Sequence, residues 1–201
     1  MFRIVGITGG IGVGKSFILR QIEQAGYPTY SADVRAKQLM EKDDFLREAI
    51  KAEFGPAAYT DGGELNRAYL AAAIFSEPKK RERLNALVHP RTFADFASWL
   101  QEREREGHPA VFKEAALTLE AGAQAGVTDL VMVYAPLKVR MRRICERDHS
   151  DEGAALSRIR SQWPEWQKIA YADFVIVNDG ILPILPQLEA LFSRLHLPFP
   201  R

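Results

Sequence analysis

The chain has 201 residues, 47% of them hydrophobic and 26% charged, which is typical of a globular protein with one core or a core plus an inserted subdomain. Lys and Arg total 27 and Asp and Glu total 26, so the net charge of +1 gives no reason to expect nucleic acid or a membrane surface as a partner. Cys145, the only cysteine, excludes an internal disulfide bond, and no apolar run approaches the ~20 residues that span a bilayer, so we expect a cytoplasmic protein. We also expect a monomer or a weak homo-oligomer.

The first predicted strand, residues 3–8 (RIVGIT), leads into a glycine-rich loop and then into a helix from Lys15 to about residue 25. The loop matches G-x-x-x-x-G-K-[ST], in which glycines let backbone N–H groups turn inward and the helix N-terminus adds partial positive charge. This pattern predicts a cradle for a nucleoside triphosphate, although so short a match also arises by chance on glycine-rich turns. The predicted cradle consists of Gly9, Gly10, Ile11, Gly12, Val13, Gly14, Lys15, Ser16 and the following Phe17.

We expect two side chains of this loop to contact the phosphates or their metal ion. We expect Lys15 to reach the β- and γ-phosphates and the Ser16 hydroxyl to bind Mg²⁺. A GTPase would also need a guanine-reading N-K-x-D motif, and a motor ATPase would need an acidic pair after an apolar strand. The chain has neither, since Lys113 and Glu114 stand at that strand end. The loop alone does not distinguish these classes, but the missing motifs leave a small-molecule kinase as the favoured one.

A shorter candidate strand, residues 28–33 (PTYSAD), ends at Asp33. In a parallel sheet this end lies on the edge that carries the glycine-rich loop. Phosphoryl transfer to a hydroxyl needs a carboxylate that orients the attacking oxygen and accepts its proton. Asp33 is therefore the predicted general base and a candidate Mg²⁺ contact. It would equally suit the N-cap of a helix over the following VRAKQLM, and both roles could coexist.

The remaining elements predict an α/β fold with two helical insertions. Residues 34–106 contain helical segments and no convincing strand, an arrangement that often builds a substrate-binding cap. Three apolar runs follow, at 110–115, 130–135 and 174–179, as expected for a parallel sheet covered on both faces. The second insertion, about 137–165, separates the last two runs.

The second insertion is rich in arginine. A helix from Leu137 to about Arg147 would place Arg140, Arg143 and Arg147 on one face. Arginines on a closing lid would neutralise the transferring phosphoryl group and exclude water from it. The alternative is a solvated face, or ion pairs with nearby acidic residues.

Ten short motifs follow one another along the chain. In chain order they are GITGGIGVGKS (6–16), ADVRAK (32–37), DGGELNR (61–67), IF (74–75), LN (84–85), HP (89–90), EAALTLEAG (114–122), RRICERD (142–148), RIRSQ (158–162) and ADFVIVNDG (172–180). No motif after the first is diagnostic, but ten in register are hard to obtain by accident. With these motifs in this order, the sequence resembles the dephospho-CoA kinases over essentially its whole length.

The resemblance implies a single domain over residues 1–201, a three-layer P-loop NTPase fold with a five-stranded parallel sheet. The core would comprise residues 1–33, 107–136 and 166–201, with a helical acceptor-binding insertion at 34–106 and a helical lid at 137–165. It also implies transfer of the γ-phosphate of ATP, with Mg²⁺, to the 3′-hydroxyl of the ribose of dephospho-CoA, the final step of coenzyme A synthesis.

The same resemblance assigns residues. It makes Arg143 a catalytic residue beside Lys15 and Asp33, and it places Arg147 in the lid and Asn178 on the adenine side, both in contact with the nucleotide. Arg67 and His89 would face dephospho-CoA, although His89 before Pro90 also fits a purely structural helix start.

Three positions depart from the family pattern. Ser31 stands where many members have Asp, Phe17 where Ser or Thr is usual, and Lys37 where Arg is common. Ser31 and Phe17 keep open a catalytically inactive nucleotide-binding regulator, and a kinase for another small hydroxyl acceptor is the nearer alternative.

Overall fold

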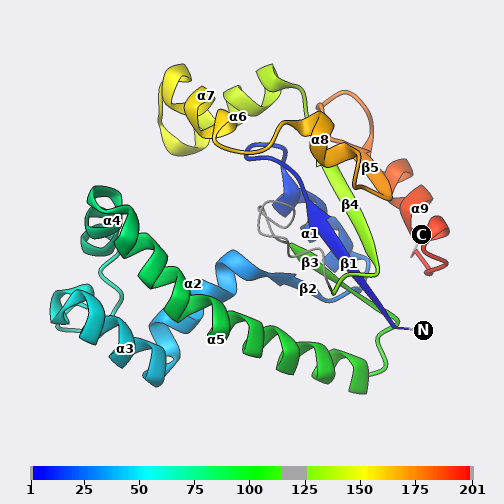
Figure 1. Ribbon diagram of the computed structural model, residues 1–201. Coiled ribbons are helices and arrows are strands. Elements are labelled where there is room, and N and C mark those ends of the chain that lie inside the picture. The colour runs from blue at the N-terminus through cyan, green and yellow to red at the C-terminus, as the bar shows by residue number, and fades with distance from the viewer. Residues whose placement is uncertain (1, 115–125, 200–201) are drawn as a thin grey trace. The chain divides into compact units, whose positions relative to one another are not determined.

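The computed structural model describes residues 2–114 and 126–199, so most of the EAALTLEAG motif lies outside the described residues. The chain divides into two compact units, one of Met1–Tyr30 with Arg103–Arg201 and one of Ser31–Glu102. In chain order the elements (Figure 1) are β1 Arg3–Thr8, α1 Lys15–Gln24, β2 Thr29–Ser31, α2 Ala32–Lys42, α3 Asp44–Phe54, the 3₁₀ turn η1 Pro56–Ala58, α4 Arg67–Ser76, α5 Pro78–Arg105, β3 Ala110–Glu114, β4 Asp129–Tyr134, α6 Leu137–Asp148, α7 Glu152–Arg160, α8 Glu165–Ile169, β5 Phe174–Val177 and α9 Ile184–Arg194.

The first unit is built on a five-stranded sheet in the order β2-β3-β1-β4-β5. β1 pairs in parallel with both β3 and β4, and β4 pairs in parallel with β5. Central strands of such a sheet are buried on both faces, which explains why these runs read as almost continuously apolar. The predicted α/β fold with a five-stranded sheet is confirmed.

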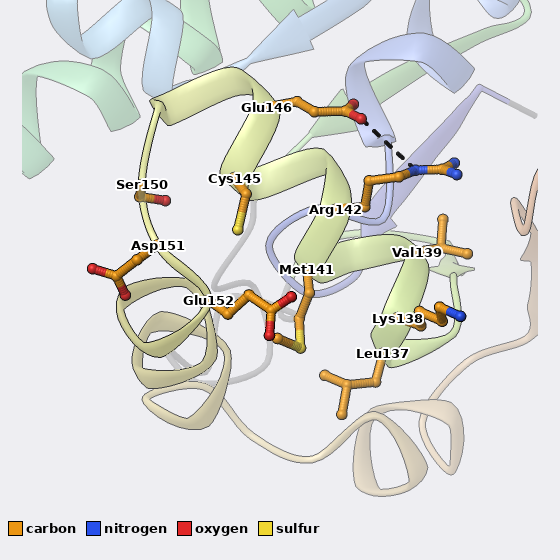
Figure 2. Close-up of a pocket in the computed structure, with 10 residues that line it drawn as sticks. All are labelled: Leu137, Lys138, Val139, Met141, Arg142, Cys145, Glu146, Ser150, Asp151 and Glu152. Atoms are coloured by element: carbon orange, nitrogen blue, oxygen red, sulfur yellow. Dashed lines mark ion pairs between the residues drawn. The ribbon is translucent and has the colours of Figure 1, made fainter.

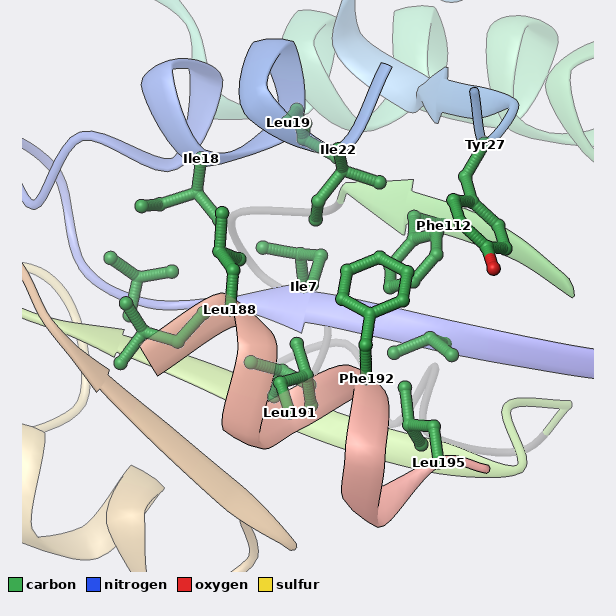
Figure 3. Close-up of a cluster of buried hydrophobic side chains, with 14 of the residues drawn as sticks. Ile7, Ile18, Leu19, Ile22, Tyr27, Phe112, Leu188, Leu191, Phe192 and Leu195 are labelled. Atoms are coloured by element: carbon green, nitrogen blue, oxygen red, sulfur yellow. The ribbon is translucent and has the colours of Figure 1, made fainter. Parts of the chain in front are cut away.

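One face of this sheet is covered by α1 and α9 (Figure 3). Ile7 of β1 and Phe112 of β3 are fully buried there against Ile18 and Ile22 of α1 and Phe192 of α9. The helical spacing of the apolar residues in α1 turns one stripe to the sheet. This packing fixes the start of α1, and with it the glycine-rich loop, at the end of β1.

The second unit is helical and has its own core. Leu46, Ile50 and Phe54 of α3 pack with Tyr59 and Leu70 in a separate buried cluster. Two N-caps start its helices: Asp43 accepts from the Leu46 N–H at 2.9 Å, and Asn66 from the Tyr69 N–H at 3.1 Å. Such caps satisfy backbone donors that the first turn of a helix leaves open.

The expectation that His89 and Pro90 start a helix is wrong. Both lie inside α5, which begins at Pro78. Pro90 removes one backbone donor from the helix interior. The neighbouring Val88 is nevertheless only 7% exposed and belongs to the core of the second unit, so packing outweighs the unfavourable proline.

Within residues 2–114 and 126–199, no helix is both long enough and apolar enough to cross a membrane.

Candidate active site

The glycine-rich loop between β1 and α1 has the backbone of an anion cradle. Gly9, Gly12 and Gly14 have φ of 143°, 81° and 90°, a region that side chains with a Cβ rarely adopt. Lys15 is only 8% exposed, and its Nζ lies 3.0 Å from the Gly9 carbonyl oxygen and 3.2 Å from that of Gly10. The loop therefore wraps around the ammonium group of Lys15.

The N-terminus of α1 faces this loop without a capping side chain. Its N-cap is Gly14, which has no side chain to accept from the first N–H groups of the helix. An uncapped helix N-terminus suits an anion such as a phosphate. Ser16, in the first turn, is exposed.

Side chains of other segments pack closely against Gly10 and Gly14 of the loop. A Cβ on Gly10 would collide with Arg140 Nη2 and Glu165 Oε1, and a Cβ on Gly14 would collide with Asn178 Nδ2. These collisions add a second reason for glycine to the one that the sequence pattern offers. Protein groups therefore pack closely against the loop at both positions.

Arg140 and Gln162 hold the backbone of Ile11. Arg140 Nε donates to the Ile11 carbonyl at 2.9 Å, and the Ile11 N–H donates to Gln162 Oε1 at 2.8 Å. Arg140 also forms an ion pair of 2.7 Å with Glu165. Burial lowers the pKa of Arg140, and the Glu165 carboxylate opposes that shift.

Arg143 and Asn178 hold the next part of the loop. Arg143 Nη1 donates to the Val13 carbonyl at 3.2 Å and to the Asn178 carbonyl at 3.0 Å. Arg147, by contrast, donates to the adjacent Asp148 at 2.7 and 2.9 Å. Of the predicted residues in the first unit, the structure thus brings Lys15, Arg143 and Asn178 together at the loop, and it does not bring Arg147 there.

In the second unit, Asp33 lines a cavity of about 360 Å³. His89 and Lys37 line the same cavity, together with Asn85 and Thr92 of α5. The unit thus brings together the predicted base and one predicted acceptor contact. Arg67 lies elsewhere, at the start of α4, where it pairs with Glu41 at 2.9 Å.

The alternative role of Asp33 as a helix N-cap is wrong. Ser31 occupies the N-cap position of α2, and Asp33 is the second residue of the helix. The helix begins two residues earlier than the capping role requires. A carboxylate in the first turn still interacts favourably with the helix dipole.

Comparison with known proteins gives one consistent result. Residues 3–183 match the family model described as dephospho-CoA kinase. A dephospho-CoA kinase of Bacteroides fragilis is 35% identical over 192 residues, covering 96% of this chain and 92% of the relative. One of Salinibacter ruber is 38% identical over 186 residues, covering 92% and 94%.

The chain belongs to the dephospho-CoA kinase family.

Solved structures agree with this membership. A crystal structure of a Thermus thermophilus protein matches with a TM-score of 0.80 at 34% identity, covering 96% of this chain and 97% of that one. The dephospho-CoA kinase from Campylobacter jejuni matches with a TM-score of 0.70 at 23% identity, covering 98% and 96%, which shows the shared fold.

The sequence of this dephospho-CoA kinase family member does not indicate two of the residues at the loop. These are Gln162, which ends the RIRSQ motif, and Glu165, which pairs with Arg140. The sequence indicates Arg140 itself only as part of an arginine face. The periodicity of α6 indicates that face, but nothing local links Glu165 or Gln162 to a loop about 150 residues earlier.

A second cavity, of about 740 Å³, lies between α6 and α7 of the dephospho-CoA kinase fold (Figure 2). Met141 and Cys145 line it together with Ser150 and several charged residues. The predicted site residues are not among those that line it. Of these two cavities, the smaller one is therefore the one that predicted site residues line.

Proposed function

We propose that this protein is a dephospho-CoA kinase, which transfers the γ-phosphate of ATP to the 3′-hydroxyl of the ribose of dephospho-CoA and yields CoA and ADP. The observation that carries this proposal is the phosphate loop closed around the Lys15 ammonium group, in a chain about 35% identical to dephospho-CoA kinases over nearly its whole length.

The proposed reaction gives a role to each of the predicted residues. Lys15 and the loop amides would hold the β- and γ-phosphates, and Arg143 would offset the charge that develops on the transferring group. Arg147 and Asn178 are proposed as further contacts to ATP. Asp33 would orient the acceptor hydroxyl and accept its proton, and His89 and Arg67 would bind the rest of dephospho-CoA.

Mg²⁺ is the proposed metal, and the donor set fits a metal held mainly by phosphates. Among the described residues, no cluster of three or more His, Cys, Asp or Glu could hold a metal by itself. Mg²⁺ at nucleotide sites characteristically keeps several waters and takes only one or two protein ligands. Ser16 would be such a ligand, and the bound ion would neutralise charge on the phosphates.

Residues 34–106 are proposed as the acceptor-binding insertion and residues 137–165 as the lid, within a single catalytic domain. The cavity beside Asp33 supports the first assignment. The contacts of Arg140, Arg143 and Gln162 with the loop support the second. The cytoplasmic location, the monomeric or weakly associating state and the lack of nucleic acid among the ligands stay predictions of the sequence.

A coupled assay of ADP release tests the proposal, with dephospho-CoA, adenosine, AMP and shikimate as acceptors. We expect turnover that depends on dephospho-CoA and Mg²⁺, with a product phosphorylated at the 3′-hydroxyl. Turnover on another acceptor and none on dephospho-CoA would indicate a different small-molecule kinase. ATP binding without turnover on any acceptor would indicate a regulator.

A further inference from the structure

Two side chains fasten Ile11, the third residue of the phosphate loop, through both of its backbone polar groups. Gln162 accepts from its N–H and Arg140 donates to its carbonyl, at 2.8 and 2.9 Å. Arg140 lies on α6, and Gln162 follows α7. The position of one loop residue is thus set by two separate segments of the chain.

Arg140 is itself held in place. It is 3% exposed, and Glu165, at the start of α8, pairs with it at 2.7 Å. A buried guanidinium is tolerated when it is paired and hydrogen-bonded, and Arg140 satisfies both conditions. The pair also occupies the space that a side chain at position 10 would need. Arg140 is therefore held in contact with the loop, and its guanidinium group points toward the Ile11 carbonyl.

The planarity of the peptide bond converts these contacts into an orientation of the loop amides. In a trans peptide, the carbonyl of one residue and the N–H of the next point in opposite directions. Because Arg140 binds the Ile11 carbonyl, the N–H of Gly12 points away from Arg140. Arg143 and Asn178 bind the Val13 carbonyl, so the N–H of Gly14 points away from them in the same manner.

We propose that Arg140, held by Glu165, is a positioning residue of the phosphate loop, which directs the Gly12 N–H toward the phosphates by binding the Ile11 carbonyl. Gln162 fixes the same residue through its N–H. An anion cradle binds most tightly when its donors already point at the ligand, since binding then requires no reorganisation. The proposal rests on the proposed function only in that the loop binds ATP, and the identity of the acceptor does not enter it.

The test is the double variant Arg140→Met/Glu165→Leu, which removes the pair without leaving one buried charge alone. The matched control is Arg142→Met/Glu146→Leu, an exposed pair on the same helix with 4.0 Å between its charged atoms (Figure 2). Calorimetric titration with ATP and Mg²⁺ should give a Kd raised about 10-fold in the first variant, as for loss of a charge-assisted hydrogen bond. The control should stay within about twofold of the unmodified protein.

Steady-state kinetics separate positioning from a general loss of structure. The KM for ATP should rise in proportion to the Kd, while the KM for dephospho-CoA stays unchanged. A folded Arg140→Met/Glu165→Leu protein with the unmodified Kd for ATP would overturn the proposal. Circular dichroism and thermal unfolding establish whether the variant is folded.

If the double variant does not fold, Arg140→Lys is the second test. It keeps a cation opposite Glu165 but lacks the guanidinium Nε–H that donates to the Ile11 carbonyl. We expect the Kd for ATP to rise about 3-fold to 10-fold, and the KM for ATP to rise in proportion. An unchanged Kd for ATP in the folded Arg140→Lys protein would overturn the proposal.

These outcomes do not depend on which acceptor molecule the enzyme phosphorylates. Weaker ATP binding in the variants, in a protein that does not phosphorylate dephospho-CoA, would support the positioning role and contradict the proposed function. If the unmodified protein phosphorylates dephospho-CoA and the folded variants keep its ATP affinity, the proposed function would be supported and the positioning role contradicted.

Discussion

Asn178 Nδ2 donates to the Val13 carbonyl at 2.8 Å, which joins the segment after β5 to the phosphate loop across 165 positions of the chain. Asn178 is 7% exposed, and its own carbonyl accepts from Arg143 at 3.0 Å. The missing Cβ of Gly14 makes room for the amide. Asn178 therefore holds the loop in place through the Val13 carbonyl, in addition to the nucleotide contact proposed for it.

Replacing Asn178 tests this support. Asn178→Ala removes the donor to Val13, and we expect the Kd for ATP to rise about 3-fold to 10-fold and the melting temperature to fall, as for loss of one buried hydrogen bond. Calorimetric titration and thermal unfolding measure the two effects. Gln101→Ala, an exposed amide on α5, is the matched control and should change neither. An Asn178→Ala protein with both the ATP affinity and the melting temperature of the unmodified protein would contradict the support of the loop by Asn178.

Gly10→Ala tests the packing of the loop against the Arg140–Glu165 pair. Gly10 does not have a positive φ, so the expected effect comes from the collision of the new Cβ with the pair and not from backbone strain. We expect the free energy of unfolding to fall by about 1–3 kcal/mol, as for overpacking at other buried positions. Gly62→Ala is the control, since its Cβ would meet Thr60 Oγ1 at an ordinary 3.7 Å. Chemical denaturation of both variants measures the free energies of unfolding. Equal values for the two variants would show that the Arg140 and Glu165 side chains can move aside without destabilising the protein.

Asp33→Asn tests the proposed general base. The change keeps the shape of the side chain and removes its capacity to accept a proton, so kcat should fall by about 10²–10⁴-fold. The Kd for ATP should stay nearly unchanged, which calorimetric titration can establish in parallel with the ADP-release assay. Full activity of this variant would leave Asp33 with only its favourable place in the first turn of α2.

The junction of α6 and α7 should make the stability depend on pH. Hydrogen bonds from Arg147, and then from Arg158, hold the pKa of Asp148 well below its usual value. Because the pKa in the folded state is lower than the unfolded value of about 3.9, this stabilisation is present above that value and is lost as the pH falls further.

Asp148→Asn should therefore lower the free energy of unfolding near neutral pH. We expect a difference of about 0.5–1 kcal/mol, the range of a solvent-screened ion pair, because the side chain is partly exposed. Denaturant unfolding at pH 7 and at about pH 3 measures it, and the difference should shrink at the lower pH. A difference that is constant with pH would show that the charge of Asp148 is not its source.

Local patterns predicted much of the first unit. The apolar runs, the spacing of Ile18 and Ile22 and the glycine–lysine–serine pattern each depend on residues a few positions apart, and the structure confirms the strand, loop and helix that they indicate. Pro90 shows the limit of such rules. Its preference for a helix start is local, whereas burial of Val88 beside it comes from the core of the second unit.

The sequence by itself therefore determined that this chain has a parallel sheet with a phosphate loop at its first strand, because hydrophobic period and glycine spacing are properties of short segments. Only the tertiary structure decided what holds that loop. Gln162 is 151 positions from Ile11, Arg140 is 129 positions from it, and Asn178 is 165 positions from Val13. Contacts at such separations depend on how helices pack onto the sheet, which no local pattern encodes.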